Sequence, residues 1–181
     1  GEPVRGEKVS ISKNGDDDYS IWKYVGLVPD GMTTRPGNVQ RGANWIVYRY
    51  ADVLLMKAEA LSQLGRYGES LTILNDIRSR AGLAQVSVQN SPIAFEDAIL
   101  NERALELAFE GKRWFDLVRM GRRNDFARKD KLVELIIKNV PSTQKRIFGS
   151  KLTNPQGWFM PIYKGELERN LNLKQNPYYK E

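Results

Sequence analysis

The sequence predicts a mainly α-helical protein whose two ends are rich in loops and which contains little β-strand. Two patterns indicate this fold class. Apolar residues recur at helical spacing through the middle of the chain, whereas clusters of Gly, Pro, Asn and Asp, which favour turns, occupy both ends. We therefore expect one region over residues 1–181, divided into a loop-rich segment (1–44), a helical part (45–140) and an irregular tail (141–181).

One short strand is expected in the N-terminal segment. Residues 19–25 are rich in aromatic and β-branched side chains and lie between turn-forming clusters. The aspartates at 16–18 offer oxygen ligands for calcium, but the spaced ligand pattern of a calcium-binding loop is missing. A solvated turn is the better interpretation of these aspartates.

A pair of antiparallel helices is predicted after residue 46. The first should end near Gly65 and bury a stripe formed by Val47, Tyr50, Leu54, Ala58, Leu61 and Leu64. The second should end at Gly82 and bury Leu71, Leu74, Ile77 and Ala81. The pattern resembles a tetratricopeptide repeat, except that Ser70 stands where Ala is usual and Gly82 where Pro is frequent.

Further helices are expected beyond this hairpin. Ser91 and Pro92 provide a helix start, and the third helix should run to about Glu110 before Gly111. Its expected apolar face consists of Ile99, Leu105, Ala108 and Phe109. A short amphipathic turn at 114–120 should stop at Gly121, and one more helix is expected at 131–139.

The absence of histidine and cysteine excludes whole classes of chemistry. Ser-His-Asp and Cys-His nucleophilic sites, His- or Cys-ligated zinc and thiol redox centres are impossible without these residues. Carboxylate chemistry remains open, because Glu102, Glu106 and Glu110 are spaced four apart on one side of the third helix. Ion pairs with arginines of neighbouring segments explain these carboxylates more simply; the arginines are Arg78, Arg80, Arg103, Arg113 and Arg119. We therefore predict no enzyme, no catalytic residue, no metal and no cofactor.

Positive charge is concentrated in residues 112–131. This segment contains eight bases and three acids, so that its net charge of +5 accounts for most of the formal net charge of +6. Such a patch can face phosphates, an acidic partner or solvent. Solvation or pairing within the protein is the preferred interpretation. Nucleic-acid binding is not expected, because Asp116 and the apolar residues beside it interrupt a continuous basic face.

Three aromatic residues in or beside loops, Trp22, Tyr24 and Trp45, are candidates for contacts with a ligand. A flat ring can stack on the apolar face of a sugar or anchor a partner protein. Core packing is the alternative, because aromatic side chains also carry the largest apolar area available to a core.

Four motifs in order carry a family resemblance: YRYADVLLMKAEA (48–60), NDIRSRAG (75–82), NERALELAFEGKRWFDLVR (101–119), and a terminal pattern that includes Pro161, Ile162 and Gln175–Asn176–Pro177. Together they resemble the SusD/RagB family of outer-membrane nutrient-binding lipoproteins over residues 21–181. Tyr163 and Leu171 depart from the prolines that the family often has at these positions.

The resemblance implies non-catalytic capture of an oligosaccharide or similar nutrient at the bacterial cell surface and its delivery to a SusC-like, TonB-dependent outer-membrane transporter. It also implies a lipid anchor, which this chain lacks, so we expect the C-terminal part of a longer lipoprotein. If sugar contacts this part, Trp22 and Trp45 are the expected stacking residues. The alternative is a structural module that docks on the transporter without binding ligand itself.

Overall fold

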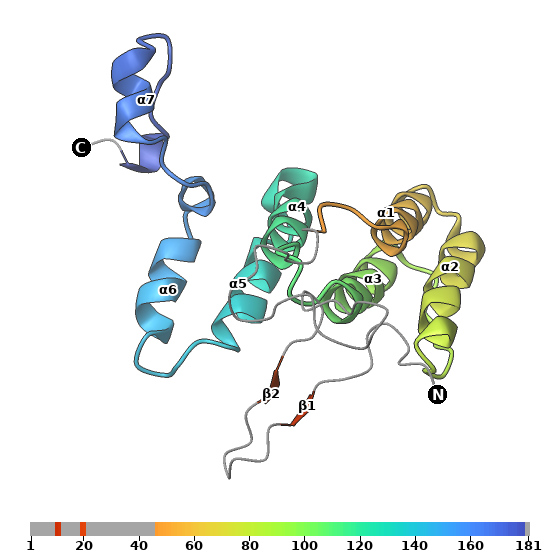
Figure 1. Ribbon diagram of the computed structural model, residues 1–181. Helices are drawn as coiled ribbons and strands as arrows, with labels where there is room; N and C mark the ends of the chain where they lie inside the picture. Colours follow the sequence, from red (N-terminus) through yellow and green to blue (C-terminus); the bar gives the residue numbers. More distant parts are fainter. Residues whose placement is uncertain (1–9, 12–18, 21–45, 180–181) are drawn as a thin grey trace, which may run out of the picture.

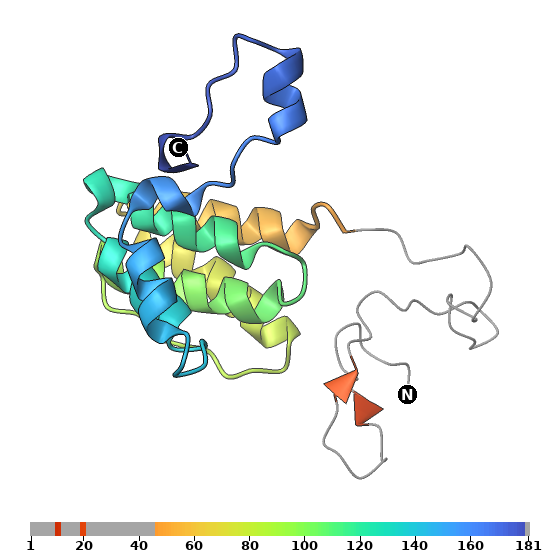
Figure 2. The same ribbon diagram turned by 90° about the vertical axis from the view of Figure 1, so that its left-hand side faces the viewer.

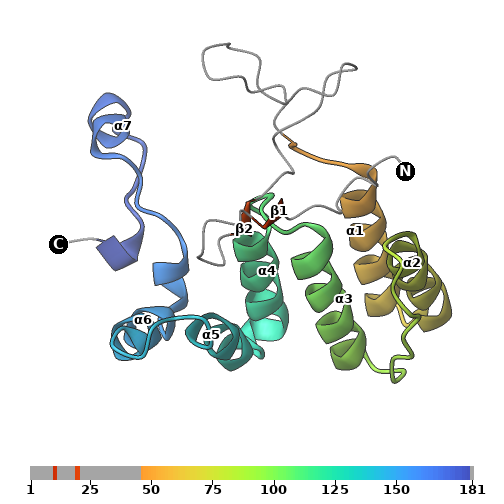
Figure 3. The same ribbon diagram turned by 60° about the horizontal axis from the view of Figure 1, so that its bottom comes forward.

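The computed structural model describes residues 10–11, 19–20 and 46–179 of the chain. Helices dominate this part, which confirms the predicted mainly α-helical class (Figure 1). Helices α1 to α6 lie side by side in one row, and the chain then leaves the row toward α7 (Figures 1 and 3). Strands in the described ranges are limited to β1 (Ser10–Ile11) and β2 (Tyr19–Ser20), which pair antiparallel. The remainder of the strand expected at 19–25 lies outside the described residues.

Helices α1 (Tyr50–Gln63) and α2 (Tyr67–Arg80) form the predicted antiparallel hairpin. Gly65 has a φ of +73°, and the amides of Gly65 and Arg66 donate to the carbonyls of Ser62 and Leu61 at 3.1 and 2.9 Å. These two bonds define a Schellman turn, in which glycine adopts the left-handed conformation without a steric penalty. Gly82 ends α2 with the same pair of bonds, so both predicted helix ends are confirmed.

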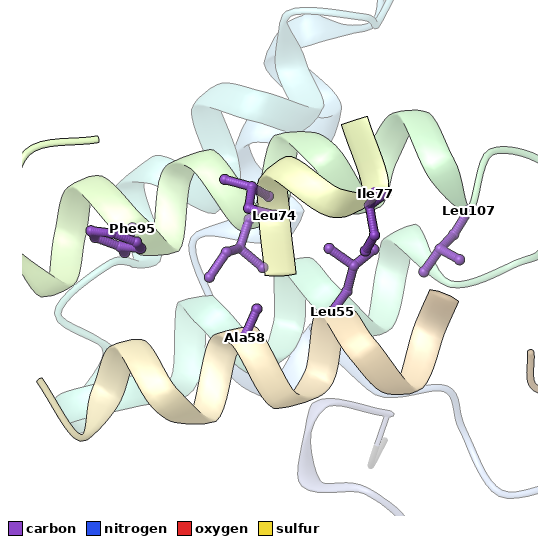
Figure 4. Packing of buried hydrophobic residues seen from close by; sticks show 7 residues of the cluster. Leu55, Ala58, Leu74, Ile77, Phe95 and Leu107 are labelled. Carbon is purple, nitrogen blue, oxygen red and sulfur yellow. The ribbon is translucent and has the colours of Figure 1, made fainter. Parts of the chain in front are cut away.

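The two helices of the hairpin approach closely at Ser70. This residue is fully buried, and its hydroxyl donates to the carbonyl of Ala58 at 2.8 Å. Serine can therefore replace the usual alanine at this position, because its side chain is small and its buried hydroxyl has a hydrogen-bond partner. The surrounding apolar cluster joins α1, α2 and α3 (Pro92–Glu106), as Figure 4 shows, and consists of Leu55, Ala58, Leu74, Ile77, Phe95, Ile99 and Leu107.

The predicted apolar stripe of α1 is confirmed at Ala58 and Leu61, which are buried, but it is wrong at its two ends. Val47 precedes the helix, and Val47 and Tyr50 are 61% and 76% exposed. The buried face also includes Asp52 and Ser62. A stripe drawn only through apolar residues misses these two positions, because buried polar groups with partners are invisible to a hydrophobic pattern.

The start of α3 is confirmed, whereas its predicted end and apolar face need correction. The hydroxyl of Ser91 accepts a hydrogen bond from the amide of Ala94 at 3.2 Å, as a capping residue does. The helix ends at Glu106, before the expected Glu110. Leu105 in its last turn and Phe109 in the turn that follows are both exposed. Ile99 of the predicted face is buried as expected, and Phe95 and Leu100 fill the other core positions of α3.

Gly121 was expected to stop a short turn, but α4 (Arg113–Phe126) runs through it. A Cβ atom at Gly121 would lie 2.9 Å from Leu132 Cδ1 and 3.1 Å from the ring of Trp158. The glycine therefore permits close packing of α4 against α5 (Lys129–Ile137) and the C-terminal segment. The second core cluster surrounds this contact and consists of Leu100, Leu117, Met120, Leu132, Leu152 and Trp158.

The C-terminal segment contains short helices between irregular stretches: α6 (Lys145–Leu152), η1 (Pro155–Trp158), α7 (Lys164–Arg169) and η2 (Pro177–Tyr179). The sequence pattern does not predict these helices, because Pro155 and Pro177 are typical of turns and here also begin 3₁₀ helices. Figure 2 shows the loop that carries α7 standing apart from the helical row. Gln175 closes this loop, since its amide group accepts from the backbone amide of Ile162 and donates to the carbonyl of Ile162, both at 2.9 Å.

Candidate functional site

The three carboxylates singled out in the sequence are all engaged by arginines. Glu102 pairs with Arg78 at 2.9 Å. Glu106 accepts hydrogen bonds from Arg49 and Arg80, and Glu110 pairs with Arg49 at 2.8 Å. The predicted Arg–carboxylate pairing is confirmed for these three residues. Arg49 was missed, because it precedes α1 and only the fold brings it to the end of α3.

The pKa of Glu106 argues against a role as a general acid. Burial opposes ionisation of this carboxyl group, but hydrogen bonds from Arg80 and Arg49 outweigh burial and lower the pKa below its ordinary value. Hydrolysis of glycosides by a carboxylate pair requires one carboxyl group with a raised pKa. Glu106 is held in the ionised state and fits an ion pair that joins helices.

A second group of charges lies between α1, α3 and α4, and all of its members except Lys112 are almost fully buried. Arg103 lies 2.9 Å from both Asp52 and Asp116, and Lys112 lies 3.3 Å from Asp52. The Arg103 contacts do not have the direction of hydrogen bonds, so they are ion pairs held by charge attraction at short range. Removing any member would leave a buried charge uncompensated, which makes this group structural.

Arginines of the basic segment 112–131 continue the network along α4. Arg119 donates to both carboxylate oxygens of Glu59 at 2.9 and 2.8 Å. Arg123 donates to Glu59 at 2.7 Å and also bonds to Glu96, which in turn accepts from Arg128. Pairing within the protein, the preferred interpretation of this segment, is confirmed for these three arginines.

The ionisation of Glu59 shows how strongly this network holds its carboxylates. Burial raises the pKa of Glu59, but hydrogen bonds and charge attraction from Arg119 and Arg123 outweigh burial, so that the pKa lies below its ordinary value. Glu59 therefore stays ionised and ties α1 to α4.

A concavity of about 220 Å³ lies at the turn between α3 and α4. In Figure 3 this turn joins the C-terminal end of α3 to the N-terminal end of α4, close to the start of α1. Its lining includes Arg103, Leu107, Phe109, Lys112, Arg113 and Trp114. Nη1 of Arg113 donates to the carbonyl of Leu100 at 2.7 Å. Burial lowers the pKa of the Arg113 guanidinium.

The outer face of α1 carries several exposed apolar side chains, two of which, Tyr50 and Leu64, belong to the stripe predicted to be buried. Tyr50, Val53, Met56 and Leu64 are all exposed. The exposed face of α2 is different, since Glu69, Thr72, Asp76 and Ser79 occupy it. An apolar outer face on one helix of a hairpin indicates a surface suited to contact with another protein segment.

The two tryptophans predicted to contact ligand, Trp22 and Trp45, lie outside the described residues, as do Tyr24 and the aspartates at 16–18. Within residues 10–11, 19–20 and 46–179, no group of three acidic side chains is arranged to hold a metal ion. No helix in the same ranges has the length and apolar character needed to cross a membrane.

Comparison with known proteins gives one consistent result. The model of the SusD family matches residues 3–179. SusD-like protein P38 of Formosa agariphila is 38% identical over 183 residues, which cover 96% of this chain and 31% of that protein. SusD-like protein P2 of the same organism is 30% identical over 185 residues, which cover 94% of this chain and 31% of that protein. The chain thus spans about a third of the length of these curated relatives.

Solved structures agree with these sequence matches. A SusD superfamily protein from Bacteroides vulgatus superimposes with a TM-score of 0.65 at 28% identity, over 80% of this chain and 29% of that chain. One from Bacteroides thetaiotaomicron gives a TM-score of 0.55 at 29% identity, over 78% of this chain and 28% of that chain. The helical row described above is therefore a fold that these proteins share.

Proposed function

Because the chain belongs to the SusD family, we propose that it takes part in the non-catalytic capture of an oligosaccharide or similar nutrient and in its delivery to a SusC-like, TonB-dependent transporter. Members of the family are generally carbohydrate-binding components of the outer membrane. The family match over residues 3–179 is the observation that carries the proposal. The place of action would be the cell surface, where a lipid anchor outside this chain would hold the protein.

The use of the described carboxylates supports binding without catalysis. The three glutamates that were candidates for acid–base chemistry all pair with arginines, and the pKa of Glu106 is lowered. A carboxylate that is fixed in the ionised state by two guanidinium groups does not donate a proton near neutral pH.

Trp22 and Trp45 remain our proposed stacking residues for a sugar ligand, because an indole ring offers a flat apolar face that matches the apolar face of a sugar ring. Substitution of both by alanine should weaken binding of a neutral oligosaccharide by at least roughly tenfold. Unchanged affinity in calorimetric titration would remove both residues from the proposed site.

Co-purification combined with titration tests the proposal as a whole. The tagged protein, expressed at its full length, should capture the TonB-dependent transporter from detergent-solubilised outer membranes and should bind soluble oligosaccharides from a panel by calorimetry. The same titration of this chain alone would show whether the ligand contacts this part of the protein. A full-length protein that neither binds any oligosaccharide nor captures the transporter would contradict the proposal.

A second candidate function is docking on the transporter without ligand contact. The apolar outer face of α1 favours it, because Tyr50, Val53 and Met56 are exposed on one side of the helix. Replacing Val53 and Met56 by Ser should then weaken capture of the transporter and leave oligosaccharide binding intact. Thr72→Ala on the polar face of α2 is the matched control.

A further inference from the structure

The concavity at the α3–α4 turn is lined by basic side chains. Among the described residues its lining includes three bases, Arg103, Lys112 and Arg113, and no acid. Arg103 and Lys112 share the two buried carboxylates of Asp52 and Asp116. Among the described residues Arg113 forms no salt bridge, although the charge of Asp116 attracts it.

The guanidinium of Arg113 is only partly solvated. Its hydrogen bond to the carbonyl of Leu100 satisfies one N–H group but does not neutralise the charge. Burial lowers the pKa of this group in spite of the attraction of Asp116, a carboxylate that Arg103 and Arg119 already share. An anion that enters the concavity would replace the stabilising interaction with water that the guanidinium loses on burial. A guanidinium fits a carboxylate in particular, because the two can form two parallel hydrogen bonds.

Aromatic rings lie beside this cation. Phe109 and Trp114 line the concavity, and Phe109 is 64% exposed. Phe109 also has a φ of +65°, a backbone conformation that is unfavourable for a bulky residue. The turn therefore holds an aromatic ring at the surface at an energetic cost, and such outliers are concentrated at functional sites.

We propose that this concavity binds one acidic sugar unit, with the sugar carboxylate on Arg113 and the apolar face of the ring against Phe109. The volume of about 220 Å³ is below the roughly 300–1,000 Å³ of pockets for drug-sized ligands, so that it suits a single ring. This inference rests on the proposed function, for which it names a class of nutrient.

Titration of the chain with sodium D-glucuronate, D-glucose and sodium sulfate at low ionic strength tests the proposal. Glucuronate should bind at least roughly tenfold more tightly than glucose, which lacks the charge, and than sulfate, which lacks the ring. The affinity for glucuronate should fall as sodium chloride is added, because salt screens an exposed ion pair. Equal affinity for sulfate and glucuronate would overturn the ring contact, and equal affinity for glucose would overturn the role of Arg113.

Two variants and one control identify the site. Arg113→Gln should weaken glucuronate binding roughly tenfold, whereas Arg122→Gln, on the same helix but outside the lining, should not change it. Phe109→Gly should weaken binding while relieving the unfavourable backbone conformation, so that lost affinity cannot be ascribed to misfolding. Full glucuronate affinity in either variant would contradict the proposal.

The outcome is separable from that of the proposed function. A full-length protein that binds neutral oligosaccharides or captures its transporter, while this chain ignores glucuronate, would keep the proposed function and lose the acidic-sugar site. Glucuronate binding that depends on Arg113 and Phe109 would establish the site even if transporter capture failed.

Discussion

The Nε atom of Arg103 in α3 lies 2.9 Å from Oδ1 of Asp116 in α4, and both side chains are almost fully buried. Because Arg103 also pairs with Asp52 of α1, one guanidinium joins three helices. The apolar clusters of the protein lie on either side of this contact, one across α1–α3 and one from α3 onward. The ion pair therefore fixes how the two halves of the helical row meet.

Asp116→Ala should lower the free energy of unfolding by about 3–5 kcal/mol, because it leaves the buried charge of Arg103 undercompensated. Glu134→Ala, which removes an exposed pair with Lys131, should cost less than about 1 kcal/mol and serves as the control. Urea denaturation followed by circular dichroism measures both. Equal losses in the two variants would show that the buried network contributes no more than a surface pair.

Gly121→Ala should destabilise the protein by about 1–3 kcal/mol, because the added methyl group would overlap Leu132 and crowd Trp158. Gly68→Ala provides a matched control within α2, where an added Cβ meets nothing within 4 Å. This control should stabilise the helix by about 0.5–1 kcal/mol, since alanine loses less backbone entropy than glycine. A thermal denaturation series would reveal the opposite signs; stabilisation in both variants would mean that the α4–α5 contact is looser than the structure shows.

The fold was predictable where local chemistry decides the structure. Gly65, Gly82 and Ser91 end or begin helices through contacts within a few residues, and each was correctly placed from the sequence. Gly121 was misjudged, because its role depends on Leu132 and Trp158, which lie far away in the chain. The same glycine chemistry suits a helix end and a close packing contact, and only the tertiary structure distinguishes them.

Stability should fall as the pH drops below about 4.3, the ordinary pKa of a glutamate. The native pKa values of Glu59 and Glu106 are lowered, so that the unfolded chain takes up protons at a higher pH than the folded protein. Their contribution is fully present above the unfolded pKa and is lost as the pH falls through the native pKa. Glu59→Gln should reduce this loss, as measured by urea midpoints at pH 7, 5, 4 and 3. An unchanged pH profile in the variant would contradict the assignment to Glu59.

The candidate sites were less predictable from the sequence than the helix ends. Pairing of Glu102 and Glu106 with arginines follows from general rules on buried carboxylates and was predicted, but the participation of Arg49 depends on how the chain enters α1. The concavity at the α3–α4 turn was not anticipated either. Phe109 was assigned to an apolar helix face, and nothing in its local sequence indicates that α3 stops at Glu106 and leaves Phe109 in a left-handed turn.

Gln175→Ala should open the loop that carries α7 without unfolding the helical row. Two hydrogen bonds of this side chain go to the backbone of Ile162 and close the loop, while a third is local, from the amide of Asn176. The exchange rate of the Ile162 amide hydrogen should rise by roughly five- to tenfold, since the loss of a hydrogen bond is worth about 1 kcal/mol. The free energy of global unfolding should change by less, because Leu171 and its neighbours at the loop tip are exposed and contribute little to either core.

Gln144→Ala is the control, as Gln144 is exposed and its side chain caps no helix. Unchanged exchange at Ile162 would show that the loop is held by contacts other than Gln175. A fall in global stability as large as that of Asp116→Ala would instead make the tail part of the core.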